Sequence, residues 1–236
     1  MKNNKIVFTP ALDNAELFEN PPVSAVKAIP EWFKKTPQKY TRKNIDKSTP
    51  DILKQGGTFK LCVPFTDAIT TGYMITTPCD LFVDNFEGDI RIYWKPTLPV
   101  VDKIDDETHF NFPIPVGYAP TVFRFISNWQ IKTPKGYSVI IQHPIYRNDL
   151  PFHSLTAVID TDEHPNQILY PFVLKEGWEG TIPAGTPIAQ ILPFKRHDWD
   201  SEIAPYSNKS DWWQHIVSRY WERSYKRQFW TRKRYR

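Results

Sequence analysis

Glycine and cysteine are scarce in this sequence. Its 236 residues include nine glycines and two cysteines, against 22 prolines. A phosphate-binding loop and a dinucleotide-binding motif both need clustered glycines, and because no such cluster is present, both motifs are excluded. Cys62 and Cys79 do not have the close spacing of metal ligands. Two cysteines in a chain of this size are typical of a reduced, cytosolic protein, with a disulfide between neighbouring strands as the alternative.

Several other features are missing. The N-terminus has no apolar segment of the kind found in signal peptides. We therefore do not expect the protein to be secreted through a signal peptide. No apolar run reaches the roughly 18 residues that a membrane-spanning helix needs. None of the six histidines has an acidic residue two positions later, as a non-haem iron site would require, and close Cys and His pairs for zinc are also absent. We therefore expect no metal and no resident cofactor.

The composition predicts a mainly β protein. Hydrophobic residues make up 40% of the chain and aromatic residues 15%, which is enough for one sizeable core. Many prolines together with many aromatic residues favour short strands and rigid loops over long helices. The net charge of +4 is mild and does not by itself indicate a nucleic-acid partner.

Short apolar runs mark the expected strands. Residues 89–94 alternate, with Ile90, Ile92 and Trp94 on one face, and residues 85–88 before them suit a hairpin turn. We expect β structure through residues 58–96, followed by strands at 122–126 and 137–142.

Residues 154–196 form the most informative stretch of the chain. Two apolar runs, 155–159 and 167–174, flank a polar turn, an arrangement typical of a hairpin. A third apolar run covers residues 181–194 and is interrupted by prolines and a glycine. The pattern predicts three further strands.

Two pieces of this stretch resemble a known superfamily. They are AVIDTD at 157–162 and IPAGTPIAQI at 182–191. Both are similar to the second half of the trimeric dUTPases and dCTP deaminases, and fainter matches lie upstream at 71–81 and 135–139. The resemblance covers roughly residues 57–196. It implies a β-clip-like (dUTPase-like) fold, an antiparallel β-sandwich or barrel.

The resemblance also implies a site. Asp160 would be the base that activates water for attack on a phosphate, and Gln190 and Arg147 would lie beside the nucleotide. Mg²⁺ belongs only to this nucleotide-hydrolase alternative, in which Asp162 or Glu163 would help to hold it. The other interpretation is structural: Asp160 caps a turn at the end of a strand, and Gln190 bonds to backbone.

The sequence departs from the superfamily where the nucleotide chemistry lies. HPIYR at 143–147 stands in place of the phosphate-gripping Arg-Ser-Gly, and Glu163 stands where the base-stacking aromatic residue is expected. The glycine-rich C-terminal arm of the superfamily is absent. We therefore expect the scaffold without its activity. If the protein is an enzyme, the expected activity is that of a dUTPase-like nucleotide pyrophosphatase.

Composition divides the chain into a Pro-rich N-terminal arm at 1–56, a β domain at 57–196 and a basic C-terminal segment at 197–236. In the arm, residues 6–8 fit a strand, and Pro30 suits the first position of a helical turn. IPEWFKK at 29–35 and CVPFTDAITTGYM at 62–74 also resemble an uncharacterised family of tailed-phage proteins. That resemblance implies the virion or the host cytoplasm as the location.

The C-terminal segment predicts an amphipathic basic helix of about 20 residues that begins near Asp211 and carries a broad aromatic stripe. Residues 219–236 hold eight Lys and Arg residues and one Glu. Three interpretations stay open: docking on the body or a second subunit, binding of a partner or of nucleic-acid backbone, and contact with a membrane surface. The expected partner-binding residues are Trp213, Trp221, Arg219, Arg223, Lys226, Arg227, Arg232, Lys233, Arg234 and Arg236.

The leading hypothesis is a non-enzymatic interaction or structural protein, phage-encoded and part of an assembly such as a virion or a head or tail accessory structure. Its partners would be further copies of the chain or other virion proteins. One alternative is a divergent nucleotide pyrophosphatase or nucleotide-binding sensor that uses Asp160. A third hypothesis is a DNA-binding accessory protein that works through the basic C-terminal tail.

Overall fold

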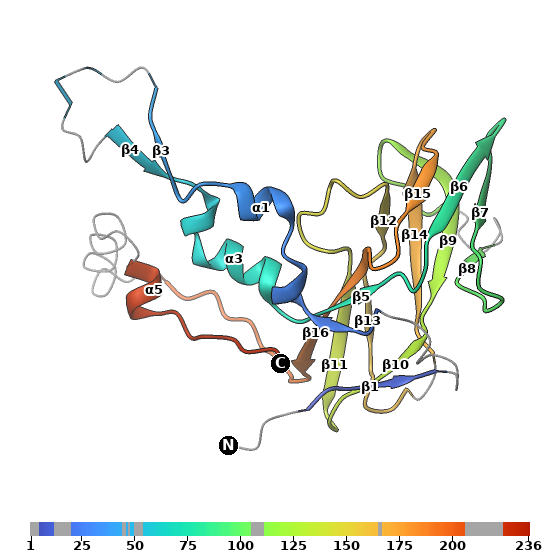
Figure 1. Ribbon diagram of the computed structural model, residues 1–236. Helices are drawn as coiled ribbons and strands as arrows, with labels where there is room; N and C mark the ends of the chain where they lie inside the picture. Colours follow the sequence, from blue (N-terminus) through green and yellow to red (C-terminus); the bar gives the residue numbers. More distant parts are fainter. Residues whose placement is uncertain are drawn as a thin grey trace. The chain divides into compact units, whose positions relative to one another are not determined.

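The structure, a computed structural model, describes residues 5–11, 20–43, 46, 48–49, 54–104, 111–164, 167–205 and 224–236. These parts of the chain are mainly β, with several antiparallel sheets and a few short helices (Figure 1). The mainly β class predicted from the sequence is therefore confirmed. Each sheet in the described parts is open, with two edge strands. No helix within those parts is long and apolar enough to cross a membrane.

The chain folds as two compact units. One, which we call the β unit, comprises residues 1–28 and 72–196, and the other, the basic unit, comprises residues 29–71 and 197–236. The basic unit contains 17 Lys and Arg residues against 9 Asp and Glu residues, a net charge of +8, whereas the β unit contains 13 against 17, a net charge of −4. The mild net charge of the whole chain therefore hides a strong asymmetry. The division at residues 56 and 196 that composition favours stays a prediction.

Two larger sheets dominate the β unit. One has the strand order β13–β11–β16–β5–β2 and the other the order β12–β14–β9–β8, with antiparallel neighbours throughout. Their bounds are β2 Val23–Ser24, β5 Tyr73–Thr76, β8 Val101–Lys103, β9 Tyr118–Ile126, β11 Tyr137–Gln142, β12 Phe152–Ser154, β13 Ala157–Ile159, β14 Leu169–Lys175 and β16 Pro187–Lys195. A short 3-10 helix, η2 (Ala25–Ala28), follows β2.

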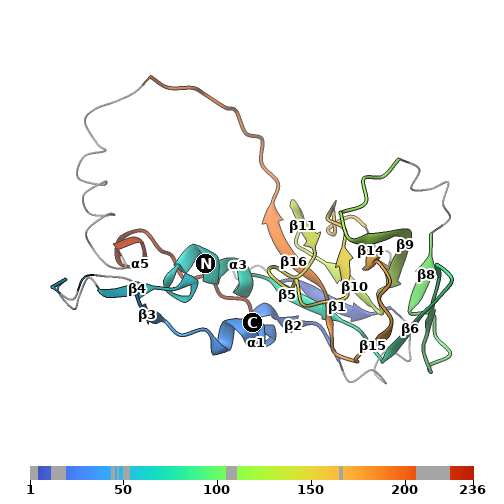
Figure 2. The same ribbon diagram turned by 90° about the horizontal axis from the view of Figure 1, so that it is seen from above.

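Two smaller sheets complete the β unit. One has the order β15–β6–β7, and the other pairs β1 with β10. Their bounds are β1 Val7–Pro10, β6 Leu81–Phe86, β7 Asp89–Tyr93, β10 Trp129–Lys132 and β15 Gly180–Ile182. Residues 197–205, which follow β16 in the chain, have no regular secondary structure (Figure 2).

Aromatic rings occupy the centre of the β unit's core. Phe125 of β9 and Phe172 of β14 stack with ring centroids 3.8 Å apart, and Phe152 of β12 meets both of them edge-on. All three side chains are buried. Such ring contacts stabilise a core beyond the burial of their apolar surface. The same core includes Ile141 of β11 and Ile191 of β16, so both larger sheets pack on it.

The hairpin predicted at residues 85–88 is confirmed. Phe86 of β6 pairs with Asp89 of β7, so Glu87 and Gly88 form a two-residue turn. Both turn residues have positive φ, 52° and 87°, as the type I′ turn between twisted strands requires. The strands predicted at 6–8, 122–126 and 137–142 are also present, as β1, β9 and β11.

The prediction of β structure at residues 58–70 is wrong. These residues form a 3-10 turn, η3 (Phe59–Leu61), and the helix α3 (Val63–Thr70). The Thr58 side chain accepts a hydrogen bond from the Lys60 N–H, and Pro64 lies in the first turn of α3, where a missing N–H costs nothing. The apolar residues follow a helical spacing, because Ile69, four residues after Phe65, is the buried residue of α3.

The hairpin expected across residues 155–174 is also wrong, although its strands exist. β13 pairs with β11, while β14 pairs with β12 and β9. The backbone of Leu155 still donates a hydrogen bond to the Pro171 carbonyl, and after it the chain crosses from one larger sheet to the other. β13 cannot pair with β14 because β12, directly upstream of Leu155, already occupies that edge of β14.

The basic unit has little regular structure. It contains α1 (Glu31–Lys35), the paired strands β3 (Lys39–Thr41) and β4 (Gln55–Gly57), η3, α3 and α5 (Ser224–Gln228). Phe65 of α3 stacks on Phe59 and Phe33, and Trp32 packs edge-on against it. The helical turn predicted after Pro30 is α1. Residues 211–223 of the predicted C-terminal helix lie outside the described residues, and the part described is helical only over α5.

Candidate functional site

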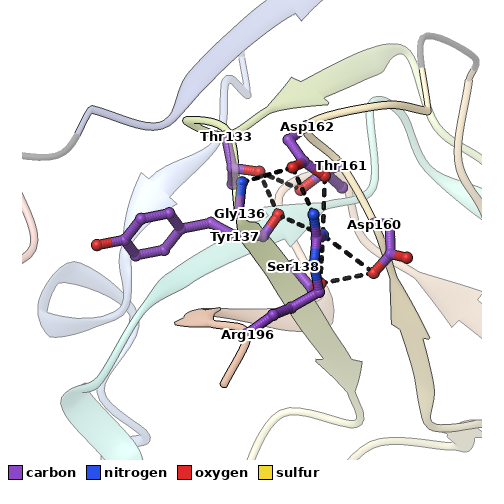
Figure 3. Close-up of polar contacts among 8 residues, drawn as sticks. All are labelled: Thr133, Gly136, Tyr137, Ser138, Asp160, Thr161, Asp162 and Arg196. Carbon is purple, nitrogen blue, oxygen red and sulfur yellow. Dashed lines mark hydrogen bonds and ion pairs between the residues drawn. The ribbon is translucent and has the colours of Figure 1, made fainter. Parts of the chain in front are cut away.

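The ends of three neighbouring strands bring the predicted catalytic Asp160 into a polar cluster. β11 begins after a turn in which Gly136 has a φ of +83°, a conformation that glycine adopts without strain. β13 ends one residue before Asp160, and β16 ends one residue before Arg196. Because β11 pairs with both of these strands, Ser138 lies beside Asp160 and close to Arg196 (Figure 3).

Arg196 and Asp162 form a two-pronged ion pair at the centre of this cluster. Nη1 of Arg196 lies 2.8 Å from Oδ1 of Asp162, and Nη2 lies 2.6 Å from Oδ2 (Figure 3). The Gly136 N–H donates a third hydrogen bond to Oδ2, at 2.7 Å. Only 2% of the Asp162 side chain is exposed. A carboxylate bound in this way to a planar guanidinium is held firmly in one orientation.

These contacts keep Asp162 ionised. The hydrogen bonds from Arg196 lower the pKa of the Asp162 carboxyl from 3.8 to about 2, with a further contribution from the Gly136 N–H and against the opposing effect of burial. The same pairing raises the pKa of Arg196 above its usual range. Both oxygens of Asp162 are thus bonded within the protein, and the Mg²⁺ role that the superfamily resemblance allows for this residue stays a prediction.

Asp160 is the accessible member of the cluster. The Ser138 hydroxyl donates a hydrogen bond of 2.6 Å to Oδ1 of Asp160, and Nη1 of Arg196 lies 3.3 Å from the same oxygen. The Asp160 side chain remains 63% exposed. Its carboxylate thus joins the turn after β13 to β11, while one face stays open to solvent.

A buried hydroxyl pair secures the turn between the two aspartates. The Thr161 hydroxyl lies 2.8 Å from that of Thr133, which itself donates to the Tyr137 carbonyl at 3.0 Å. Thr161 is only 1% exposed. This pair, Ser138 and Arg196 were not predicted as part of the site, because nothing in the local sequence marks residues that meet only through strand pairing.

The other two predicted nucleotide-binding residues serve a loop elsewhere. Gln190 is fully buried, and its Oε1 accepts the Ile145 N–H at 3.0 Å. Arg147 forms a two-pronged ion pair with Asp149, and its side chain is 16% exposed. Both side chains stabilise the loop between β11 and β12, so the backbone-bonding alternative for Gln190 is the one observed.

Asp160 does not meet Gln190 and Arg147. Gln190 is paired with Gln142 at the C-terminal end of β11, whereas Asp160 lies beside Ser138 near its N-terminal end. At about 3.3 Å a residue, the four residues between Ser138 and Gln142 span roughly 13 Å of strand. The three predicted site residues therefore form two separate groups.

The charge around Asp160 is unfavourable for a phosphate. Asp160, Asp162 and Glu163 supply three negative charges to one turn, and the Arg196 guanidinium contacts this turn. That guanidinium is already bonded to Asp162, Ser138 and the Tyr137 carbonyl. A phosphate would have to displace these bonds and approach carboxylates of its own sign. Within the described residues, no group of three or more His, Cys, Asp or Glu side chains is placed to hold a metal ion.

Both cysteines are free thiols in the structure. Cys79 is half buried, and burial together with the nearby Asp80 raises the pKa of its thiol. Cys62 is exposed.

Six of the predicted partner-binding residues are described, and all six are exposed: Lys226, Arg227, Arg232, Lys233, Arg234 and Arg236. The remaining four, Trp213, Arg219, Trp221 and Arg223, lie outside the described residues.

We expect Asp162→Asn to destabilise the β unit at neutral pH, because the amide places an N–H group against Arg196 or Gly136. The folded pKa of Asp162 lies below its unfolded value of 3.8. The carboxylate therefore contributes stability that is fully present above that value and is lost as the pH falls towards about 2. Thermal melts should show a wide gap between wild type and variant at pH 7 that closes by about pH 2. The control is Asp160→Asn, whose exposed carboxylate should matter much less. A gap that stays constant with pH would contradict the role of the ion pair.

Compared with known proteins, the chain matches no family model and no curated protein sequence.

Proposed function

We propose that the protein is a non-enzymatic interaction or structural protein that works as part of an assembly. The observation that carries this proposal is the state of the predicted nucleotide site. Asp160 is bonded to Ser138, Gln190 to the Ile145 backbone and Arg147 to Asp149. They lie in two groups at opposite ends of β11, and neither group offers an unoccupied cation for a phosphate.

The fold proposal is that the β unit is β-clip-like, of the dUTPase type, with its nucleotide chemistry lost. The antiparallel sheets support it, as does the arrangement of the motif at 182–191. That motif forms the end of β15, a turn with Gly185 at a φ of +78°, and most of β16. The resemblance of residues 29–35 and 62–74 to tailed-phage proteins makes a phage particle or its assembly intermediates the proposed setting, with virion proteins or further copies of the chain as partners.

A combined melting and turnover experiment tests this proposal. The full chain is melted with a panel of nucleoside triphosphates and Mg²⁺ while pyrophosphate release is measured in the same samples. We expect no shift in melting temperature and no turnover, and we expect Asp160→Asn to behave like wild type. Light scattering should give a mass that is a multiple of the 27.7 kDa chain.

The nucleotide alternative predicts the opposite result. A ligand at a hundred times its Kd adds about 2.7 kcal/mol to the free energy of unfolding, which corresponds to roughly 5–11 °C for a chain of this size. Such a shift, together with turnover that Asp160→Asn abolishes, would replace the proposal by a divergent pyrophosphatase. The exposed carboxylate of Asp160 beside the Ser138 hydroxyl is the observation in favour of that alternative. A shift without turnover would indicate a nucleotide sensor.

A further inference from the structure

The C-terminal residues 224–236, which we call the basic segment, concentrate positive charge on the surface of the basic unit. They include six Lys and Arg residues and no Asp or Glu, and all six basic side chains are exposed. We propose that the basic segment binds the sugar-phosphate backbone of nucleic acid, with a preference for single strands. This site goes beyond the proposed function, because it depends neither on the β unit nor on whether that unit acts on nucleotides.

The basic segment is attached to the folded part of the basic unit rather than hanging from it as a loose tail. Trp230 donates its indole N–H to Oδ2 of Asp67 in α3 at 2.8 Å, and Nζ of Lys233 lies 2.6 Å from the same oxygen. The ammonium groups of Lys226 and Lys233 lie 5.8 and 6.0 Å from the Trp230 ring centroid. Cations at such distances over an indole face are held by cation–π attraction.

This anchor leaves the segment strongly positive. The acidic residue in this anchor is Asp67, and Lys233 neutralises it. Its carboxylate also raises the pKa of Lys233, so that this side chain stays charged. The segment itself carries six Lys and Arg residues and no Asp or Glu, and its attachment to α3 lowers the entropy lost when a polyanion binds.

Charge distribution favours a polyanion over other occupants of this surface. The basic unit carries a net charge of +8 and the β unit one of −4, so the positive field is confined to one part of the chain. Closely spaced phosphates release their condensed counterions when Lys and Arg side chains neutralise them, and this term dominates nucleic-acid binding. A second copy of the chain would offer only the weaker, dispersed negative charge of its β unit.

Exposed aromatic rings point to single strands. Tyr225 and Phe229 are 44% and 56% exposed. The Phe229 N–H donates to the Tyr225 carbonyl, so the two residues are one helical turn apart and share a side of α5. Unpaired bases stack on exposed aromatic side chains beside a basic track, whereas the bases of a duplex are not available for such stacking.

The test measures the affinity of the full chain for a labelled 20-nucleotide single strand and for the matching duplex, by fluorescence anisotropy between 50 and 200 mM salt. We expect tighter binding to the single strand and an affinity that falls steeply with salt. Neutralisation of five phosphates by the basic residues other than Lys233 would give a slope of about −3.5 for log K against log salt. The triple variant Arg227→Gln, Arg232→Gln, Arg234→Gln should weaken binding at least tenfold and reduce the steepness of the slope by about 2.

The matched control removes the same charge from the β unit through Lys95→Gln, Lys103→Gln and Lys135→Gln, all at exposed positions. This control variant should bind the single strand with nearly the affinity of the wild-type chain. A second variant, Tyr225→Ala with Phe229→Ala, should bind the single strand with about tenfold lower affinity, while its affinity for the duplex should change little. Circular dichroism and melting temperature must show that each variant remains folded.

Several outcomes would overturn the proposal. They are an absence of binding at 50 mM salt, equal losses in the basic-segment and β-unit variants, and binding to vesicles of anionic lipid but not to nucleic acid. A basic-segment variant that dissociates the oligomer while it keeps its nucleic-acid affinity would also reject the proposal, and would assign the surface to contact between copies of the chain.

Discussion

Gly72→Ala is expected to destabilise the β unit severely. Gly72 has a φ of +83°, and a Cβ added to it would lie 2.1 Å from the carbonyl oxygen of Ile191 in β16. The left-handed backbone conformation costs alanine about 1–2 kcal/mol. The overlap with a backbone oxygen costs roughly another 1–3 kcal/mol, because a strand in the middle of a sheet has to move. The two costs together should lower the melting temperature by about 5–15 °C.

Gly117→Ala is the matched control for this prediction. Gly117 has nearly the same φ, +86°, but a Cβ added there meets no atom within 4 Å. The control therefore carries the conformational cost alone, and the difference between the two variants measures the close approach of Gly72 to Ile191. Equal melting temperatures for the two variants would contradict the close contact between the start of β5 and β16. Tyr73 pairs with Ile191 directly after this contact, so the register of β5 depends on it.

The elements that the sequence predicted correctly are those whose pattern is local. The β6–β7 hairpin follows from alternation and a turn that ends in glycine, and its Ile90 is buried as the pattern requires. α3 was missed because a short apolar run of residues fits a strand and a helix equally well, and Pro64 in the first turn favours the helix. The pairing of β13 with β11 was missed because strand partners distant in sequence leave no local trace.

The candidate site shows the same limit. Motifs in the sequence predicted Asp160 and Gln190 as site residues, and both side chains form polar contacts within the β unit. The motifs could not reveal that Arg196 would reach back to Asp162, since this ion pair depends on where β16 ends relative to β11. Nor could they reveal that Arg147 would be bound by Asp149, two residues away. Strand register, rather than residue type, separates the predicted residues into two groups.

Acid is expected to destabilise the β unit through His143, between about pH 6.5 and 4. Nδ1 of His143 accepts the Ser154 N–H at 3.2 Å, and its Nε2 lies 3.2 Å from the Arg147 carbonyl, so the neutral ring with a proton on Nε2 fits both contacts. Burial lowers the pKa of His143 from 6.5 to about 4, opposed by the hydrogen bond to the Arg147 carbonyl and by Asp149, and assisted by the charges of His153 and the Arg147 guanidinium. Protonation of Nδ1 would remove the acceptor of the Ser154 N–H and place two N–H donors opposite each other.

The folded pKa of His143 lies below its unfolded value, so the unfolded chain takes up the proton first as the pH falls. The stability that the neutral ring contributes is fully present above pH 6.5 and is lost as the pH falls towards 4. The separation of the two pKa values corresponds to a loss of about 3 kcal/mol by pH 4. Urea unfolding at a series of pH values measures this loss as a slope of up to about 1.4 kcal/mol per pH unit.

His143→Asn separates this effect from the protonation of carboxylates. The asparagine oxygen can still accept the Ser154 N–H but cannot take up a proton, so the variant should be less stable at pH 7.5 by about 1 kcal/mol, the value of one lost hydrogen bond. Its stability should then fall more slowly than that of wild type as the pH drops from 6.5 to 4, and the two curves should approach or cross. The matched histidine control, His197→Asn, changes an exposed residue beyond β16 and should keep the wild-type slope. If His143→Asn kept that slope as well, the loop between β11 and β12 would owe its acid sensitivity to Asp149 and its pairing with Arg147 instead.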